Sequence, residues 1–239
     1  MATRRAAQLG RNLMLWLHIL TSVGWMSQAL AMFVLVWTGM AATAPGLRLA
    51  AFSMAEVLDK NILVLMANTS AYTGLMLSAL TPWGYFRYWW VLIKFVISIV
   101  QLYVGIVILS PGLSDAVQAA QQGRPGGGWS TLLGGLLMGS AIAFQGWLSV
   151  AKPWNHTPWA TRPSAPKRLP NASGWVYLAS LTVPVADTLL GFAVIGHPVP
   201  LLMLITVLAY PLWRRRRLRR AAAAAEAPLR HAAVRAGRG

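Results

Sequence analysis

The sequence predicts an all-α fold, a polytopic transmembrane helical bundle of about six helices with both termini in the cytoplasm. Apolar residues make up 56% of the 239 residues and charged residues only 11%, about half the charged fraction of a soluble domain. The apolar residues gather in runs of ~20, enough to cross ~30 Å of hydrocarbon. Basic residues fall in alternate connecting segments, as in multi-pass membrane proteins.

Six apolar segments are the predicted spans, at residues 12–36, 61–80, 89–109, 131–150, 175–195 and 199–213. The sixth is short and the fifth contains Pro184, so the last hairpin is the least regular. Residues 114–130 are rich in Gly and residues 153–174 in Pro and basic side chains, which predicts irregular loops. We therefore expect a bundle at 1–213 and a basic, disordered cytoplasmic tail at 214–239.

Charge predicts the orientation of the bundle. Basic residues precede the first span, separate the second from the third and the fourth from the fifth, and follow the sixth: Arg4, Arg5, Arg11, Arg87, Lys152, Arg162, Lys167, Arg168 and the run 214–220. The opposite side carries Arg48, Lys60 and Arg124, offset by Glu56, Asp59 and Asp115. The positive-inside rule thus places both termini in the cytoplasm. We expect the C-terminal Arg run to meet anionic lipid headgroups, not nucleic acid.

Composition limits the chemistry and the location expected of this protein. The chain has no Cys, which excludes disulfides and thiolate chemistry. Its Ala- and Arg-rich composition is typical of a high-GC bacterium, so the expected location is the bacterial inner (plasma) membrane. Eight of the 12 Trp lie at predicted helix ends, an aromatic belt at headgroup level: Trp37, Trp83, Trp89, Trp129, Trp154, Trp159, Trp175 and Trp213.

Polar residues inside the predicted spans are the candidate functional residues: His18, Lys94, Asp187, Gln101, Asn68 and Gln145. Ionisable groups are costly in hydrocarbon and face a partner, a cavity or a ligand. A helix rise of ~1.5 Å per residue predicts two layers. His18, Lys94 and Gln145 form a cytoplasmic-side layer, whereas Asn68, Gln101 and Asp187 lie near the midplane.

Structural interpretations compete with the functional ones. Lys94 is close enough to the interface for its amine to snorkel into the headgroups, and His18 can simply hydrogen-bond a backbone carbonyl or Gln145. Amide side chains such as those of Asn68, Gln101 and Gln145 often hydrogen-bond between helices. Asp187 is too deep to reach the interface, which makes it the strongest functional candidate. On the fourth span, Gly135, Gly139 and Ala143 predict close packing within the bundle, with a dimer face as the alternative.

Two segments resemble a group of small bacterial membrane proteins. Leu17-His18-Ile19-Leu20 followed by Gly24-Trp25-Met26 is similar to the first helix of the CopD-type copper-resistance proteins, the HemJ-type protoporphyrinogen oxidases and an uncharacterised predicted integral-membrane family. Thr73-Gly74 and Trp90-Val91-Leu92-Ile93-Lys94 resemble their second and third helices. The third helix of the enzymes carries a His where this chain has Gln101, so a ligand for haem, porphyrin or copper is missing there.

Three functions remain open at this stage, and the catalytic residues are unknown. The first is handling of a small molecule, metal or proton, in which His18 titrates or ligates, Lys94 holds an anionic group such as a propionate and Asp187 carries a proton. The second is a non-catalytic membrane scaffold or subunit that packs against a protein partner or a second copy. The third, implied by the resemblance alone, is a HemJ-like tetrapyrrole oxidoreductase, with haem as its cofactor. No motif predicts a resident metal.

Overall fold

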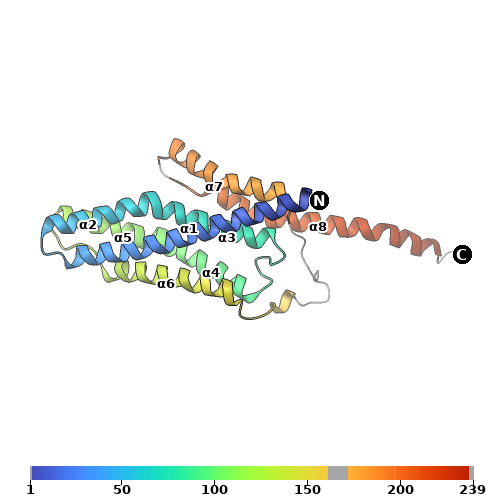
Figure 1. The fold of residues 1–239 in the computed structure, drawn as a ribbon, viewed down its shortest axis with the longest axis horizontal. Helices are drawn as coiled ribbons and strands as arrows, with labels where there is room; N and C mark the ends of the chain where they lie inside the picture. Colours follow the sequence, from blue (N-terminus) through green and yellow to red (C-terminus); the bar gives the residue numbers. More distant parts are fainter. Residues whose placement is uncertain (1, 161–171, 197, 237–239) are drawn as a thin grey trace.

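The computed structural model describes residues 2–160, 172–196 and 198–236, and this part of the chain is all-helical (Figure 1). The helices form six continuous helical rods, which we number first to sixth in chain order. They are α1 (Ala2–Ala41), then α2 (Pro45–Leu58) with η1 (Asp59–Leu63) and α3 (Val64–Leu80), then α4 (Trp89–Val104) with η2 (Gly105–Leu109) and α5 (Ser110–Gln121), then α6 (Trp129–Ala151), α7 (Gly174–Val194) and α8 (Leu201–Ala236). A short 3₁₀ turn, η3 (Pro158–Ala160), lies between α6 and α7.

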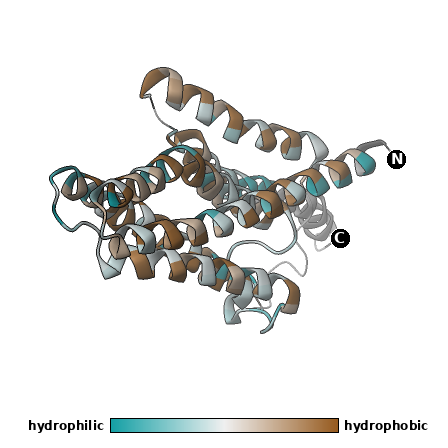
Figure 2. Cartoon of the chain, turned by 60° about the vertical axis from the view of Figure 1, so that its left-hand side comes forward, coloured by the Kyte–Doolittle hydropathy of each residue, from teal (hydrophilic) through white to brown (hydrophobic). Residues whose placement is uncertain are grey.

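Among the described residues, four helices are long and apolar enough to cross a membrane: Arg5–Ala41, Trp89–Gln121, Trp129–Ala151 and Gly174–Val194. These helices contain the predicted first, third, fourth and fifth spans. The predicted second and sixth spans lie in α3 and α8, which are not among the four. Figure 2 shows apolar residues along the helices, and many large apolar side chains are exposed, where water would strongly disfavour them.

The central helix of the bundle is α1, which packs against α2, α3, α6 and α7. The α4 helix packs against α3 and α6 as well, so α1 and α4 lie diagonally across a four-helix core. Trp25 of α1 occupies the centre of this core, in one apolar cluster with Ala67 of α3 and Ile142 of α6, and Leu102 of α4 packs against the cluster. Side chains that α1 and α4 direct inward therefore approach each other.

Close packing of α6 on α1 depends on two glycines. A Cβ at Gly135 would lie 3.1 Å from the carbonyl oxygen of Ala29, and one at Gly139 would lie 3.0 Å from the Leu30 side chain. These two glycines therefore pack within the bundle, whereas Ala143 is exposed and takes no part.

The structure corrects the loop predicted at residues 114–130 and adds a helix between the first two predicted spans. Residues 45–58 and 110–121 are helical, so the second and third rods extend well beyond the predicted spans. Phe52 and Ala55 of α2 pack with Leu113 and Val117 of α5 in a buried apolar cluster. This burial stabilises both helices.

Two π-helical turns lie at the same level in these neighbouring rods. Asp59 begins η1 and Ser110 follows η2, and the Ser110 hydroxyl donates to the Asp59 carboxylate at 2.6 Å. One turn further out, Ser114 donates to Glu56 at 2.6 Å. The second and third rods are thus joined by polar contacts at the end distant from the termini.

The chain termini lie at one end of the bundle (Figure 1). The α8 helix starts part-way along the bundle, runs to this end and continues beyond it to Ala236. Residues 214–236 continue α8 in the structure, in keeping with the high helix propensity of Ala and Arg, and the disordered tail stays a prediction.

A polar seam as the candidate functional site

His18 of α1 is held by α3 through one ring nitrogen. Its Nδ1 lies 3.0 Å from the Ser70 carbonyl oxygen and 3.1 Å from the Thr73 hydroxyl oxygen. A carbonyl only accepts, so Nδ1 carries the hydrogen and a neutral ring has its lone pair on Nε2. No hydrogen bond reaches Nε2 from the described residues. A His held in this way can accept a proton or ligate a metal through Nε2.

Gly74 provides the space for this ring. A Cβ at Gly74 would lie 2.8 Å from Cε1 of His18, well inside van der Waals contact. Thr73 is fully buried and its hydroxyl donates to the Thr69 carbonyl at 2.7 Å. The Leu-His and Thr-Gly segments, which are separate in the sequence, thus contact each other and form one structural unit.

Lys94 of α4 points toward α6. Its ammonium donates to the Ser149 hydroxyl at 2.6 Å, and that hydroxyl donates to the Gln145 carbonyl at 2.9 Å. Within the described residues no carboxylate pairs with Lys94; the ion pair found there joins Lys60 to Glu56. The ammonium is close enough to interact electrostatically with His18. Lys94 therefore has a hydrogen-bonding partner on α6, and the snorkelling interpretation stays a prediction.

Gln101 and Gln145 continue the same line of polar groups. The Ser98 hydroxyl donates to Oε1 of Gln145 at 3.0 Å, and Nε2 of Gln145 donates to Oε1 of Gln101 at 2.6 Å. Nε2 of Gln101 then donates to the Met138 carbonyl at 3.1 Å. We call His18, Lys94, Ser98, Gln101, Gln145 and Ser149 the polar seam. Its two amides join the layers that helix rise had separated, and they bind α4 to α6.

Asp187 lies outside this seam and caps a helix. Its Oδ1 accepts the backbone N–H of Leu202 at 2.9 Å and its Oδ2 accepts that of Met203 at 2.7 Å. These donors belong to the first turn of α8, where backbone N–H groups lack helical partners. Asp187 is only 3% exposed, so both oxygens of a buried carboxylate serve the start of α8. Asp187, the strongest functional candidate from the sequence, thus has a structural role as a helix cap.

Two further amides lie in the bundle. The Asn68 side chain is buried and has no hydrogen bond within the described part of the chain. Oε1 of Gln28, which sequence reasoning missed, is buried without a partner there. Sequence reasoning also missed the Ser70, Thr73 and Ser149 contacts. The available signal was the small hydroxyl residues within the neighbouring predicted spans.

Comparison of the chain with protein-family models, curated proteins and solved structures gives no match. The resemblance to the CopD and HemJ groups stays a prediction.

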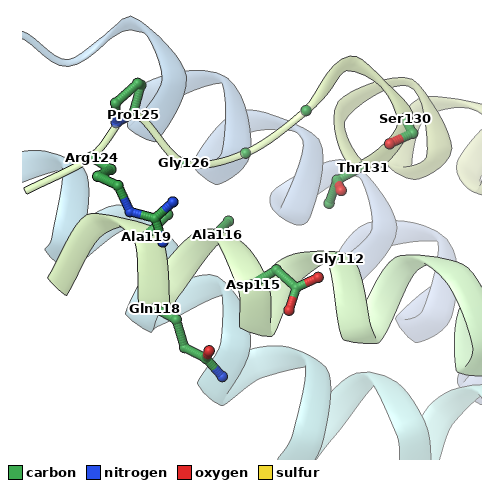
Figure 3. A pocket seen from close by; sticks show the side chains of 12 residues that line it. Gly112, Asp115, Ala116, Gln118, Ala119, Arg124, Pro125, Gly126, Ser130 and Thr131 are labelled. Carbon is green, nitrogen blue, oxygen red and sulfur yellow. The ribbon is translucent and has the colours of Figure 1, made fainter. Parts of the chain in front are cut away.

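Two further observations concern the described residues outside the polar seam. Among the described residues, no group of three or more His, Asp or Glu side chains is arranged to hold a metal ion. A pocket of about 430 Å³ opens at the outer end between α5 and the Gly-rich segment before α6 (Figure 3). Asp115, Arg124 and Thr131 line it, but none of the predicted site residues does.

Proposed function

We propose that this chain is an integral membrane protein of the bacterial plasma membrane that binds the acidic group of a small molecule between His18 and Lys94. The six helical rods, with both termini at one end of the bundle (Figure 1), support six crossings or partial crossings. The basic residues near that end support a cytoplasmic location for it. The His18 and Lys94 pair then lies in the cytoplasmic half of the bundle.

The observation that carries this proposal is a cation, Lys94, that has no anionic partner among the described residues and lies within electrostatic reach of an unused acceptor on His18. An ammonium within a bundle is unfavourable without an anionic partner, and the described residues offer Lys94 only a hydroxyl. A carboxylate from a ligand would supply the missing charge. Nε2 of His18 would accept a proton from the same molecule.

The hydrogen bonds of Gln101, Gln145 and Asp187 are better explained by structural roles. Gln101 and Gln145 use their amides on each other and on α6. Asp187 uses both oxygens on α8. The proton-carrying role expected of Asp187 is therefore left out of the proposal, which concerns His18 and Lys94.

Protoporphyrin, which carries two propionates, is a suitable probe, with its dimethyl ester as the uncharged control. The purified protein should bind the diacid more tightly than the ester, measured by the Soret absorbance. Lys94→Gln should remove that preference and His18→Ala should weaken binding of both, whereas Lys152→Gln should change neither. Absence of saturable binding, or equal binding of acid and ester by the unchanged protein, would reject the proposal. A Soret band in the protein as purified would favour a resident tetrapyrrole.

A non-catalytic subunit is the second candidate, and the outer face of the third rod favours it. Val96, Val100, Tyr103, Ile106 and Val107 are each more than half exposed. Such a face can pack against a partner helix as readily as against lipid. Photo-crosslinkers at Val100 and Ile106 in living cells test this role. A discrete protein adduct supports a subunit, and lipid adducts alone argue against it.

A further inference from the structure

A groove between α7 and α8 lies apart from the polar seam. Its volume is about 260 Å³, and it is lined by Trp175, Val176, Ala179, Ser180, Val183, Thr206, Tyr210 and Trp213. The groove is open on its outer side, where the neighbouring Leu178 and Val185 are exposed. It therefore faces the surroundings of the bundle.

The walls of the groove suit a hydrocarbon chain. The hydroxyls of Ser180 and Thr206 donate to carbonyls of their own helices, at 2.8 and 2.7 Å, so they offer no unused donor. From Trp175 to Val183 the groove follows α7 for ~12 Å at ~1.5 Å per residue. That length accommodates the upper half of an acyl chain.

Cationic groups stand at one end of this groove. The Arg217 guanidinium lies 5.4 Å from the ring centroid of Trp213, a groove residue. Both Arg214 and Arg217 interact electrostatically with Tyr210 in the groove wall. Arg214 also donates to the carbonyls of Ala79 and Thr81 at the end of α3, which anchors this end of α8 to the bundle.

We propose that the groove holds one anionic phospholipid, with an acyl chain along α7 and its phosphate at Arg217. An apolar groove ending at guanidinium groups matches both parts of such a lipid. A second copy of the chain fits less well, because it would bring its own Arg run against the first. The inference rests on the proposed membrane placement but not on the ligand at His18 and Lys94.

Native mass spectrometry of the full chain in detergent, with added phosphatidylglycerol or phosphatidylcholine, tests this site. One phosphatidylglycerol should be retained in preference to phosphatidylcholine. Arg217→Gln should weaken phosphatidylglycerol retention about fivefold, the effect of one basic residue on an anionic headgroup, with Arg220→Gln as the matched control. Ala179→Phe should fill the groove and displace the lipid, whereas Leu178→Phe on the outer face of α7 should not.

Three results would overturn the inference. They are equal retention of the two lipids, equal loss in Arg217→Gln and Arg220→Gln, and full retention by a folded Ala179→Phe variant. A lipid-free dimer that Ala179→Phe dissociates would instead assign the groove to a second copy. All four variants leave His18 and Lys94 intact, so porphyrin binding remains a separate measurement. Loss of lipid binding with porphyrin binding retained would reject this site alone.

Discussion

Tyr72 of α3 donates its hydroxyl to the Ser180 carbonyl of α7 at 3.0 Å, and Pro184 is the reason that this carbonyl is available. Proline has no N–H, so the carbonyl four residues earlier loses its helical partner. Pro184 lies within α7, and Tyr72 and Ser180 are both buried. The tyrosine therefore satisfies a carbonyl that the proline leaves open, and in doing so ties α7 to α3.

This relationship predicts a coupled stability change. Tyr72→Phe should lower the free energy of unfolding by about 1–3 kcal/mol, the cost of a buried unsatisfied acceptor. With Pro184→Ala in place, the backbone N–H of residue 184 can bond Ser180, and Tyr72→Phe should cost clearly less. Unfolding by SDS in mixed micelles measures all four proteins of the cycle. An equal cost in both backgrounds would contradict the proposed role of Pro184.

Asp187 should affect stability, not ligand binding. Asp187→Ala removes both acceptors from the first turn of α8 and should cost about 2 kcal/mol. Asp187→Asn keeps one acceptor and should cost about half as much. The exposed Asp115→Ala is the control, with little expected change. If Asp187→Asn were fully stable yet lost porphyrin binding, Asp187 would belong to the functional site.

Gly74 should control the His18 ring. Gly74→Ala places a methyl group 2.8 Å from Cε1 of His18, so the ring must move and lose its bond to Ser70. Overpacking of this kind costs about 1–3 kcal/mol. Nitrogen NMR of labelled histidine should report a changed tautomer balance. Gly146→Ala is the matched control on α6, since nothing lies within 4 Å of its Cβ position, and an unchanged His18 signal in Gly74→Ala would contradict the contact.

The two glutamines of the polar seam should behave as a pair. Gln145→Leu alone leaves Gln101 and Ser98 without their partner and should cost about 1–3 kcal/mol. The double change Gln101→Leu with Gln145→Leu removes both halves of the contact, so its cost should fall below the sum of the single changes. The same SDS titration measures this cycle. Strict additivity would show that the amide contact does not couple α4 to α6.

The outer end of the bundle should weaken in acid. Hydrogen bonds from Lys60 and Ser114 lower the pKa of Glu56 from its ordinary 4.5, so its contribution to stability is present above pH 4.5 and is lost as pH falls further. Burial raises the pKa of neighbouring Asp59, which acts in the opposite direction. The measurement therefore compares the stability of the unchanged chain with that of Glu56→Gln at each pH. Their stabilities should converge below pH 4.5, and parallel pH curves would contradict the assignment.

Sequence reasoning located the helices well where a long apolar run marks them. The fourth predicted span, 131–150, agrees with α6 at Trp129–Ala151, and the fifth, 175–195, agrees with α7 at Gly174–Val194. It placed residues 114–121 of α5 in a loop and did not predict α2. Those helices are stabilised by Phe52 and Leu113 packing against each other, a contact between distant segments that no local pattern contains.

The candidate site divides in the same way. Residue type and depth were enough to single out His18, Lys94, Gln101, Gln145 and Asp187, because polar groups in an apolar run are costly wherever the run folds. Their roles depended on partners from other helices. Depth alone separated Asp187 from Lys94 in the sequence, whereas in the structure Asp187 accepts from two backbone N–H groups and Lys94 donates to a single hydroxyl.

The sequence by itself determined an all-helical chain with apolar spans and the short set of polar residues within them, since both follow from local composition and the cost of polarity in hydrocarbon. Only the tertiary structure decided which of those residues are satisfied. It is the packing of α1 on α3, of α4 on α6 and of α8 on α7 that sets their hydrogen-bond partners. That packing makes Asp187 the cap of α8. Among the described residues it leaves Nε2 of His18 without a hydrogen bond and Lys94 without an anionic partner.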